Sequence, residues 1–206
     1  MKIDDSLASQ LPYGSFTPDG EVYLRGRGLM VGFEFRGLSL EASSPADLQA
    51  AVNRLVEAFR HLGTNDMVQP IFHRLPHMAY PERGFPSQAA RLIDKERRMQ
   101  FEAEDYWRLL GRLYITTQIE SANSSRVHSA MFGSGKWDPS LSLVLARFRE
   151  RLENFRDALG GTIELRRLTP EETFRDLILC VTGRDFPAAV PNGPVRLNEL
   201  IASERF

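Results

Sequence analysis

The chain has 206 residues, enough for one globular domain, or at most two small ones, with a sizeable core. Its composition, 42% hydrophobic and 26% charged, excludes collagen-like and disordered chains. The 26 Lys and Arg against 27 Asp and Glu give a net charge of −1, without the positive surplus usual in proteins that bind nucleic-acid backbones. Cys180 is the only cysteine, so no intrachain disulfide can form and a reducing compartment is expected. No stretch approaches the roughly 20 apolar residues of a membrane-spanning helix, and the N-terminus does not resemble a secretory signal, so we expect any membrane association to come through a partner or a missing segment.

The first half of the chain alternates strand and helix signals. The pattern predicts strands over 22–24, 29–35 and 67–72 and a helix between Ser44 and Gly63. Ser44 can cap that helix, Pro45 suits its first position, and Asp47 favours its positive end. The turn Arg25–Gly28 joins the first two strands as a hairpin, and Pro70 indicates that the third strand lies at an edge or is interrupted.

The second half of the chain continues the alternation. It predicts helices over 88–105, 140–159, 170–181 and 195–204 and strands over 109–119 and 162–168. The first of these helices carries mixed charges at helical spacing, which predicts an exposed helix. Thr169 and Glu172 form a capping box in the sequence. The order of elements predicts an α+β fold: a mixed or antiparallel sheet with helices packed mainly on one face.

The stretch Gly133-Ser134-Gly135-Lys136 suggests a phosphate-binding loop, but its surroundings do not fit one. A Walker A loop reads G-x-x-x-x-G-K-[ST], and here Ala130 stands where the first glycine is required and Trp137 where the magnesium-binding hydroxyl is required. The loop also follows the polar run 121–129 instead of a buried strand, and the next helix begins only after Pro139. We therefore interpret the stretch as an ordinary turn.

The four histidines do not indicate a metal site. His73 and His77 are four residues apart, but Pro76 makes a helix between them unlikely to form, and no third ligand stands at a supporting spacing. His61 and His128 lie far away in the sequence. Surface histidines are the preferred interpretation.

Two further groups of reactive side chains lack the context that catalysis needs. The carboxylates Glu102, Glu104 and Asp105 cluster without the separated environments of an acid–base pair, so a solvated helix end is expected. Cys180 follows the apolar residues Ile178 and Leu179, which predicts a buried, inert thiol. We assign no catalytic, cofactor-binding or metal-binding residue.

Three stretches form a combined pattern. The first, 29–55, carries Phe33-Glu34-Phe35-Arg36-Gly37 ahead of a capped helix, and the last, 166–202, carries Cys180-Val181 and Val190-Pro191. The middle stretch, 80–104, carries Tyr80, Pro81, Phe85, Pro86, Asp94, Glu96, Arg97, Arg98 and Phe101. Together these stretches resemble the TrbE family of conjugative-transfer ATPases, which includes the VirB-type ATPases of type IV secretion systems. The resemblance covers roughly residues 20–206 in matching order. It departs at the turn Arg25–Gly28 and over 105–135, and the exposed turns 25–28 and 121–136 are candidates for contacts with a system-specific partner.

The resemblance implies that residues 1–206 form a single N-terminal, non-motor domain and that the P-loop ATPase domain, with its ATP and Mg²⁺, lies beyond residue 206. It implies a non-catalytic docking and assembly domain that faces the cytoplasm as a peripheral component of the inner membrane and needs no cofactor of its own. The implied partners are its own ATPase domain, a small inner-membrane subunit of the secretion system, and other copies of the ATPase in a hexamer, with no direct nucleic acid. Two alternatives stay open: a stand-alone nucleotide-binding protein with a degenerate phosphate loop, and a free-standing adaptor without a motor.

Overall fold

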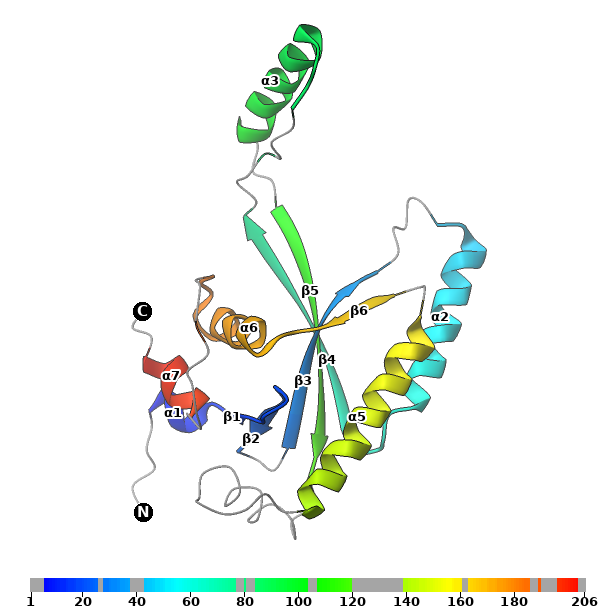
Figure 1. The fold of residues 1–206 in the computed structure, drawn as a ribbon, viewed down its shortest axis with the longest axis vertical. Coiled ribbons are helices and arrows are strands. Elements are labelled where there is room, and N and C mark those ends of the chain that lie inside the picture. The colour runs from blue at the N-terminus through cyan, green and yellow to red at the C-terminus, as the bar shows by residue number, and fades with distance from the viewer. Residues whose placement is uncertain are drawn as a thin grey trace. The chain divides into compact units, whose positions relative to one another are not determined.

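A computed structural model describes residues 6–25, 28–37, 43–76, 80, 84–103, 107–119, 139–160, 163–185, 189 and 196–203. Its helices are α1 (Leu7–Gln10), α2 (Pro45–Arg60), α3 (Gln88–Ala103), α5 (Pro139–Leu159), α6 (Pro170–Thr182) and α7 (Leu197–Ser203). Its strands are β1 (Tyr13–Phe16), β2 (Val22–Leu24), β3 (Gly28–Arg36), β4 (Asp66–Pro76), β5 (Trp107–Gln118) and β6 (Glu164–Arg167) (Figure 1).

The chain, expected as a single domain over 1–206, divides into two compact units. Unit 1 comprises Met1–Gln69 and Leu113–Phe206, and unit 2 comprises Pro70–Arg112. Strand β4 begins in unit 1 and ends in unit 2, and β5 begins in unit 2 and ends in unit 1, so the chain enters unit 2 along one strand and leaves it along the next. We call unit 2 the arm.

The strands form a mostly antiparallel sheet in the order β1-β2-β3-β5-β4, with β6 also paired to β3. The predicted hairpin is confirmed: β2 and β3 are antiparallel, with Val22 opposite Met30 and Leu24 opposite Gly28. Strand β4 lies at the end of this order, as Pro70 predicted, because a proline has no N–H to donate to a second neighbouring strand.

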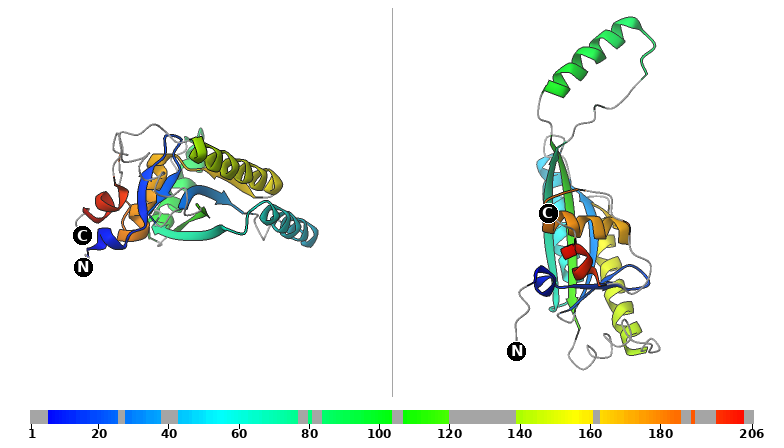
Figure 2. Two further views of the ribbon diagram at one scale, coloured as in Figure 1. Left: turned by 90° about the horizontal axis from the view of Figure 1, so that it is seen from below. Right: turned by 90° about the vertical axis from the view of Figure 1, so that its left-hand side faces the viewer.

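Helix α5 supplies the main hydrophobic layer on one face of the sheet. Its side chains Phe148, Phe155 and Leu159 are almost completely buried and pack with residues of β3 that alternate along the strand, such as Leu29 and Val31. Each fully buried side chain of this kind contributes about 1.5–3 kcal/mol. Helix α2 packs beside α5, and the two helices lie next to each other in Figure 1 and in the left view of Figure 2.

Helix α6 covers the opposite face of the sheet. The hydroxyl of Tyr114 on β5 donates to the carboxylate of the buried Asp176 on α6, whereas Ile115, the next residue of the strand, packs in the cluster with α5. Neighbouring residues of a strand point to opposite faces, so the two helices sandwich it. A Cβ at Gly32 would lie 2.8 Å from Tyr114 Cε1 and 2.9 Å from Leu168 Cδ1, so only glycine fits this layer without a shift.

The α+β class and most predicted elements are confirmed. Both capping boxes form: the Asp47 amide donates to Ser44 Oγ at 3.2 Å, and the Glu172 amide donates to Thr169 Oγ1 at 3.2 Å. The short elements α1 and β1 were not predicted, because four residues carry too little periodicity. Among the described residues, no helix has the length and apolar character that crossing a membrane requires.

Candidate functional site

The two turns predicted as contact candidates are only partly described. The stretch Gly133–Lys136 and the segment 121–136 lie outside the described residues, as do residues 26 and 27. At the ends of the first turn, Gly28 is buried and the Arg25 side chain donates to the carbonyl oxygen of Ala8 at 3.2 Å. This turn is therefore tied to α1 at its first residue.

The histidines and carboxylates weighed in the sequence lie on several elements, and some lie outside the described residues. His61 is exposed at the end of α2 and His73 is half-buried in β4, while His77 and His128 lie outside the described residues. Glu102 is exposed near the end of α3, and Glu104 and Asp105 lie outside the described residues.

The expectation of a buried Cys180 is wrong: the thiol is exposed. The apolar run Ile178–Val181 is longer than one face of a helix, since four successive residues extend around most of its circumference, so some of the run must point outward. The buried side is formed by residues such as Phe174, Leu177 and Ile178. The thiol contributes instead to the electrostatics of Tyr13, whose pKa is raised by burial and by the neighbouring Cys180 and Asp176.

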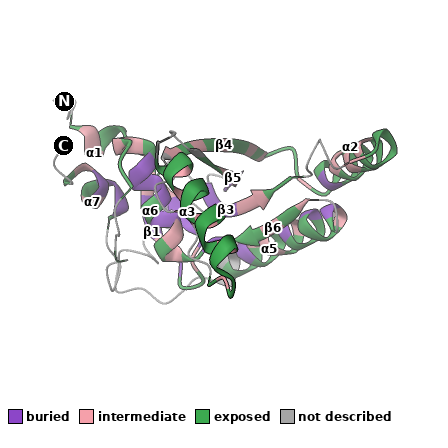
Figure 3. Ribbon diagram, turned by 90° about the horizontal axis from the view of Figure 1, so that it is seen from above, coloured by how far each residue is buried: buried purple, intermediate pink, exposed green. Residues whose placement is uncertain are grey.

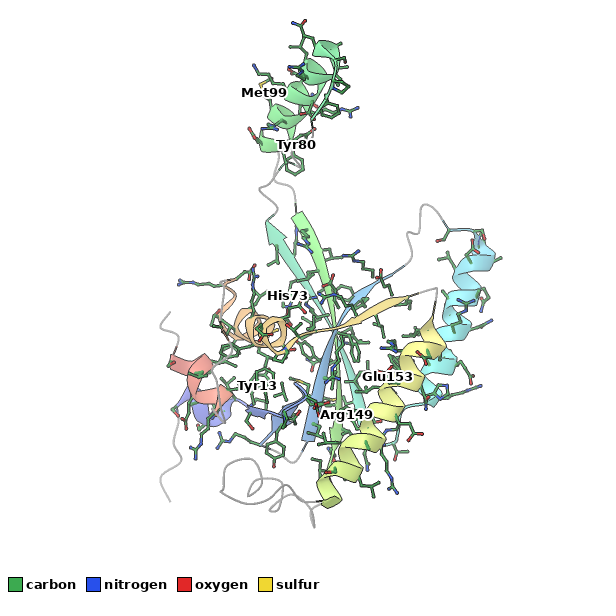
Figure 4. All side chains as sticks on the ribbon, in the orientation of Figure 1. Tyr13, His73, Tyr80, Met99, Arg149 and Glu153 are labelled. Atoms are coloured by element: carbon green, nitrogen blue, oxygen red, sulfur yellow. The ribbon has the colours of Figure 1, made fainter. Side chains whose placement is uncertain are left out.

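A fully buried carboxylate, Glu21, organises the charges of unit 1. Arg149 of α5 donates to it through Nε at 2.7 Å and through Nη2 at 2.9 Å, Arg167 of β6 donates at 2.9 Å, and the Thr17 hydroxyl also donates (Figure 4). Burial by itself raises the pKa of Glu21, but the hydrogen bonds from Arg149 and Thr17 outweigh it and hold the pKa at about 2. Arg149 also pairs with Asp19 at 2.7 Å. This cluster fastens the turn before β2 to α5 and β6, which is a structural role.

A second buried carboxylate, Asp66, lies where β4 begins. Arg151 of α5 donates to it at 2.9 and 3.1 Å and to the Thr117 hydroxyl at 3.2 Å, and the Gly63 amide donates to it at 2.7 Å. A pocket of about 370 Å³ opens beside this network, with Arg147 in its wall. The pocket is lined by Gly63, Thr64, Asn65, Asp66, Thr117, Gln118, Ile119, Leu143, Val144, Arg147 and Arg151. Because both partners of its central ion pair are already engaged, we assign this network to the positioning of β4 against α5.

The arm contains a cluster built from the residues that carried the family resemblance. The Tyr80 hydroxyl donates to Asp94 at 2.7 Å, and the Tyr80 ring meets the Phe101 ring edge-on at 5.5 Å between centroids. The Arg98 guanidinium lies over the same ring, 5.4 Å from its centroid. The hydrogen bond to Asp94 also raises the pKa of Tyr80. Three positions of α3 thus hold Tyr80 against the helix.

The remainder of α3 carries exposed apolar side chains. Leu92 is 63% exposed, Ile93 58% and Met99 47%, and Figure 3 colours most of the helix as exposed. Figure 4 shows the Met99 side chain pointing away from the helix. Beside them lies an open cleft of about 570 Å³, lined by Gly84, Phe85, Arg91, Asp94, Lys95 and Arg98. The mixed charges of this helix predicted its exposure. Its apolar residues were not predicted to form a surface, because charged residues outnumber them in the sequence.

The chain is similar to proteins of conjugal transfer. The family described as "Type IV secretion system ATPase VirB4/TrbE, N-terminal domain" matches residues 20–125. A conjugal transfer protein TrbE of Rhizobium radiobacter is 24% identical over 219 residues, which cover 97% of this chain and 27% of the relative. The first portion of a probable conjugal transfer protein TrbE of Sinorhizobium fredii (strain NBRC 101917 / NGR234) is 29% identical over 102 residues, 48% of this chain and 68% of the relative. The chain therefore spans about a quarter of the length of the Rhizobium radiobacter relative, and the family match includes the whole arm.

Proposed function

Because the chain belongs to the N-terminal domain family of the VirB4/TrbE type IV secretion ATPases, we propose that it is a docking and assembly domain without catalytic activity of its own. In this role it links the motor of a conjugative transfer system to the inner-membrane complex. Nucleotide-driven motion of the motor is passed to the channel base through the packed sheet and helices of unit 1.

The observation that carries this proposal is the arm. A helix that holds its partly buried charged residues, Asp94 and Arg98, toward Tyr80 and exposes Leu92, Ile93 and Met99 is built to meet something outside the chain. Exposed apolar clusters of this kind are a common property of interaction sites. Loops and projecting segments on a rigid scaffold are also where binding residues concentrate.

The proposed partners follow from the family. They are the ATPase domain of the same protein, a small integral inner-membrane subunit, and other copies of the ATPase assembled as a hexamer. ATP and Mg²⁺ belong to the motor and not to residues 1–206, and direct contact with nucleic acid does not belong to the role. The domain then works at the cytoplasmic face of the inner membrane as a peripheral component.

Co-purification tests this proposal. We would co-express the tagged 206-residue chain with the inner-membrane subunits of its transfer system, extract the membranes in detergent, and identify which subunits are retained. Retention of a defined inner-membrane subunit, lost in Leu92→Ser/Met99→Ser but kept in the matched variant Val52→Ser/Val56→Ser on α2, supports docking through the arm. Val52 and Val56 are suitable controls because they are 53% and 51% exposed. Failure to retain any inner-membrane subunit, under conditions where the chain is folded, contradicts the proposal.

A further inference from the structure

The arm helix α3 has two dissimilar sides. At 100° per residue, the partly buried residues Ala90, Asp94, Arg98 and Phe101 share one side and face Tyr80. Leu92 and Met99, seven residues apart, share the other side and are exposed. Water contact with these apolar side chains is unfavourable, so a partner that buries them gains free energy.

Positive charge borders the exposed apolar side. Arg91 and Lys95, four residues apart, line the flank of the helix next to Leu92 and Met99, and Arg98 lies farther round toward Tyr80. All three line the open cleft of about 570 Å³. Among the residues that the structure describes, neither Arg91 nor Lys95 forms an ion pair. The one acidic lining residue, Asp94, accepts the hydrogen bond from Tyr80.

We propose that this flank of α3 lies on an anionic lipid surface. Arg91 and Lys95 hold phosphate headgroups in the cleft, and Leu92 and Met99 enter the boundary between headgroups and acyl chains. This combination of a basic flank with an adjacent apolar stripe is the one that interfacial helices use. The inference rests on the proposed function, since the anionic cytoplasmic leaflet is the surface that such a docking domain meets.

The chemistry of the site favours lipid over single-stranded nucleic acid. A bilayer interface accepts a lone helical face that carries both cations and apolar side chains. Single-stranded nucleic acid binds through aromatic stacking platforms, and Phe85 is the one aromatic residue among those that line the cleft. The exposed Leu92 and Met99 would also add nothing to the binding of a phosphate backbone.

The carboxylate of Glu96 should weaken binding to an anionic surface, so variants of α3 can be expected both to strengthen and to weaken that binding. It lies one helical turn after Leu92 and is exposed, so its carboxylate stands near the anionic surface. Replacing it by glutamine removes a repulsion. Glu96→Gln is therefore expected to strengthen binding to anionic vesicles while Arg91→Gln/Lys95→Gln weakens it.

The experiment is co-flotation of the 206-residue chain with vesicles of phosphatidylcholine, with or without phosphatidylglycerol. Binding is expected only with phosphatidylglycerol, and Arg91→Gln/Lys95→Gln and Leu92→Ser/Met99→Ser should each lower the partition coefficient about 10-fold or more. The matched controls are Arg147→Gln/Arg184→Gln, which removes the same charge at exposed positions, and Val52→Ser/Val56→Ser, which removes apolar side chains exposed to 53% and 51%. Both controls should bind as the parent chain does. Circular dichroism of each variant confirms that the substitutions leave the fold intact.

Other outcomes overturn the proposal. Equal partition into vesicles with and without phosphatidylglycerol, or arm variants that bind like the controls, would show that this face does not contact lipid. Competition by millimolar inorganic phosphate at constant ionic strength would identify a site for free phosphate. Binding of a single-stranded oligonucleotide that requires Arg91 and Lys95 but not Leu92 and Met99 would identify a nucleic-acid site. Because the vesicles contain no protein, failure here with intact co-purification removes only the lipid inference.

Discussion

Replacing Glu21 by glutamine tests how unit 1 is held together. The Glu21 side chain is fully buried, and its pKa is lowered from 4.5 to about 2. A difference of this size corresponds to about 3 kcal/mol of folding free energy at neutral pH. Glu21→Gln should therefore reduce the free energy of unfolding by about 2–4 kcal/mol. The lower value of this range is expected if Arg149 and Arg167, whose side chains are 34% and 38% exposed, become hydrated in the variant.

The pH dependence of the effect identifies its cause. Since the folded-state pKa of Glu21 lies below the ordinary value, its stabilisation is complete above pH 4.5 and declines as the pH falls toward 2. Urea unfolding followed by circular dichroism, at constant ionic strength, should show the parent chain losing this stability while Glu21→Gln does not. The gap between the two proteins should shrink to less than about half its neutral value by pH 3.

An exposed ion pair provides the control. Glu199 pairs with Arg196 at 2.9 Å, and their side chains are 57% and 61% exposed, so Glu199→Gln should change the free energy of unfolding by less than about 1 kcal/mol. The reasoning is refuted if Glu21→Gln costs no more than this control. It is also refuted if the gap between Glu21→Gln and the parent chain is the same at pH 3 and pH 7.

Three further predictions concern the packing layer, the arm and the glycine–lysine stretch. Gly32→Ala places a methyl group 2.8 Å from Tyr114 Cε1 and should cost about 1–3 kcal/mol in urea unfolding; an unchanged midpoint would mean that the layer has room to spare. Tyr80→Ala removes the ring and the hydroxyl that contact α3, so trypsin should cleave within 70–112 faster than in Tyr80→Phe, which keeps the ring. Equal cleavage rates would show that the ring does not protect this segment. Calorimetry with ATP or ADP and magnesium should show no binding to the chain or to Lys136→Ala. Saturable binding that the variant loses would instead establish a nucleotide site.

Local signals in the sequence predicted the regular elements well. The start of α6 follows from Thr169 and Glu172, because the capping hydrogen bonds join residues that are three apart in the sequence. The same holds for α2 and Ser44. Helix α6 ends before Gly183, which adopts the left-handed conformation with a φ of 70°. Strand β1 was missed because its four residues gain their structure from pairing with β2, not from their own pattern.

The buried charges and the arm surface could not be predicted in this way. Glu21 reads as an ordinary exposed carboxylate, and its partners Arg149 and Arg167 are more than a hundred residues away in the chain. The residues of the Tyr80 cluster were indicated only by the family resemblance. The sequence did not show that three of them contact Tyr80. Exposure of Leu92 depends on which side of α3 faces Tyr80, which spacing within the helix alone does not decide.

The place where the arm enters the chain has an evolutionary consequence. Residues 77–106 are inserted between β4 and β5, which are neighbours in the sheet, so a short turn could join the two strands and leave the topology of unit 1 unchanged. An insertion of this type can be lengthened, exchanged or lost without redesign of the core that carries it. Selection can therefore alter the arm while the sheet, α5 and the Glu21 cluster stay under a separate constraint, that of folding.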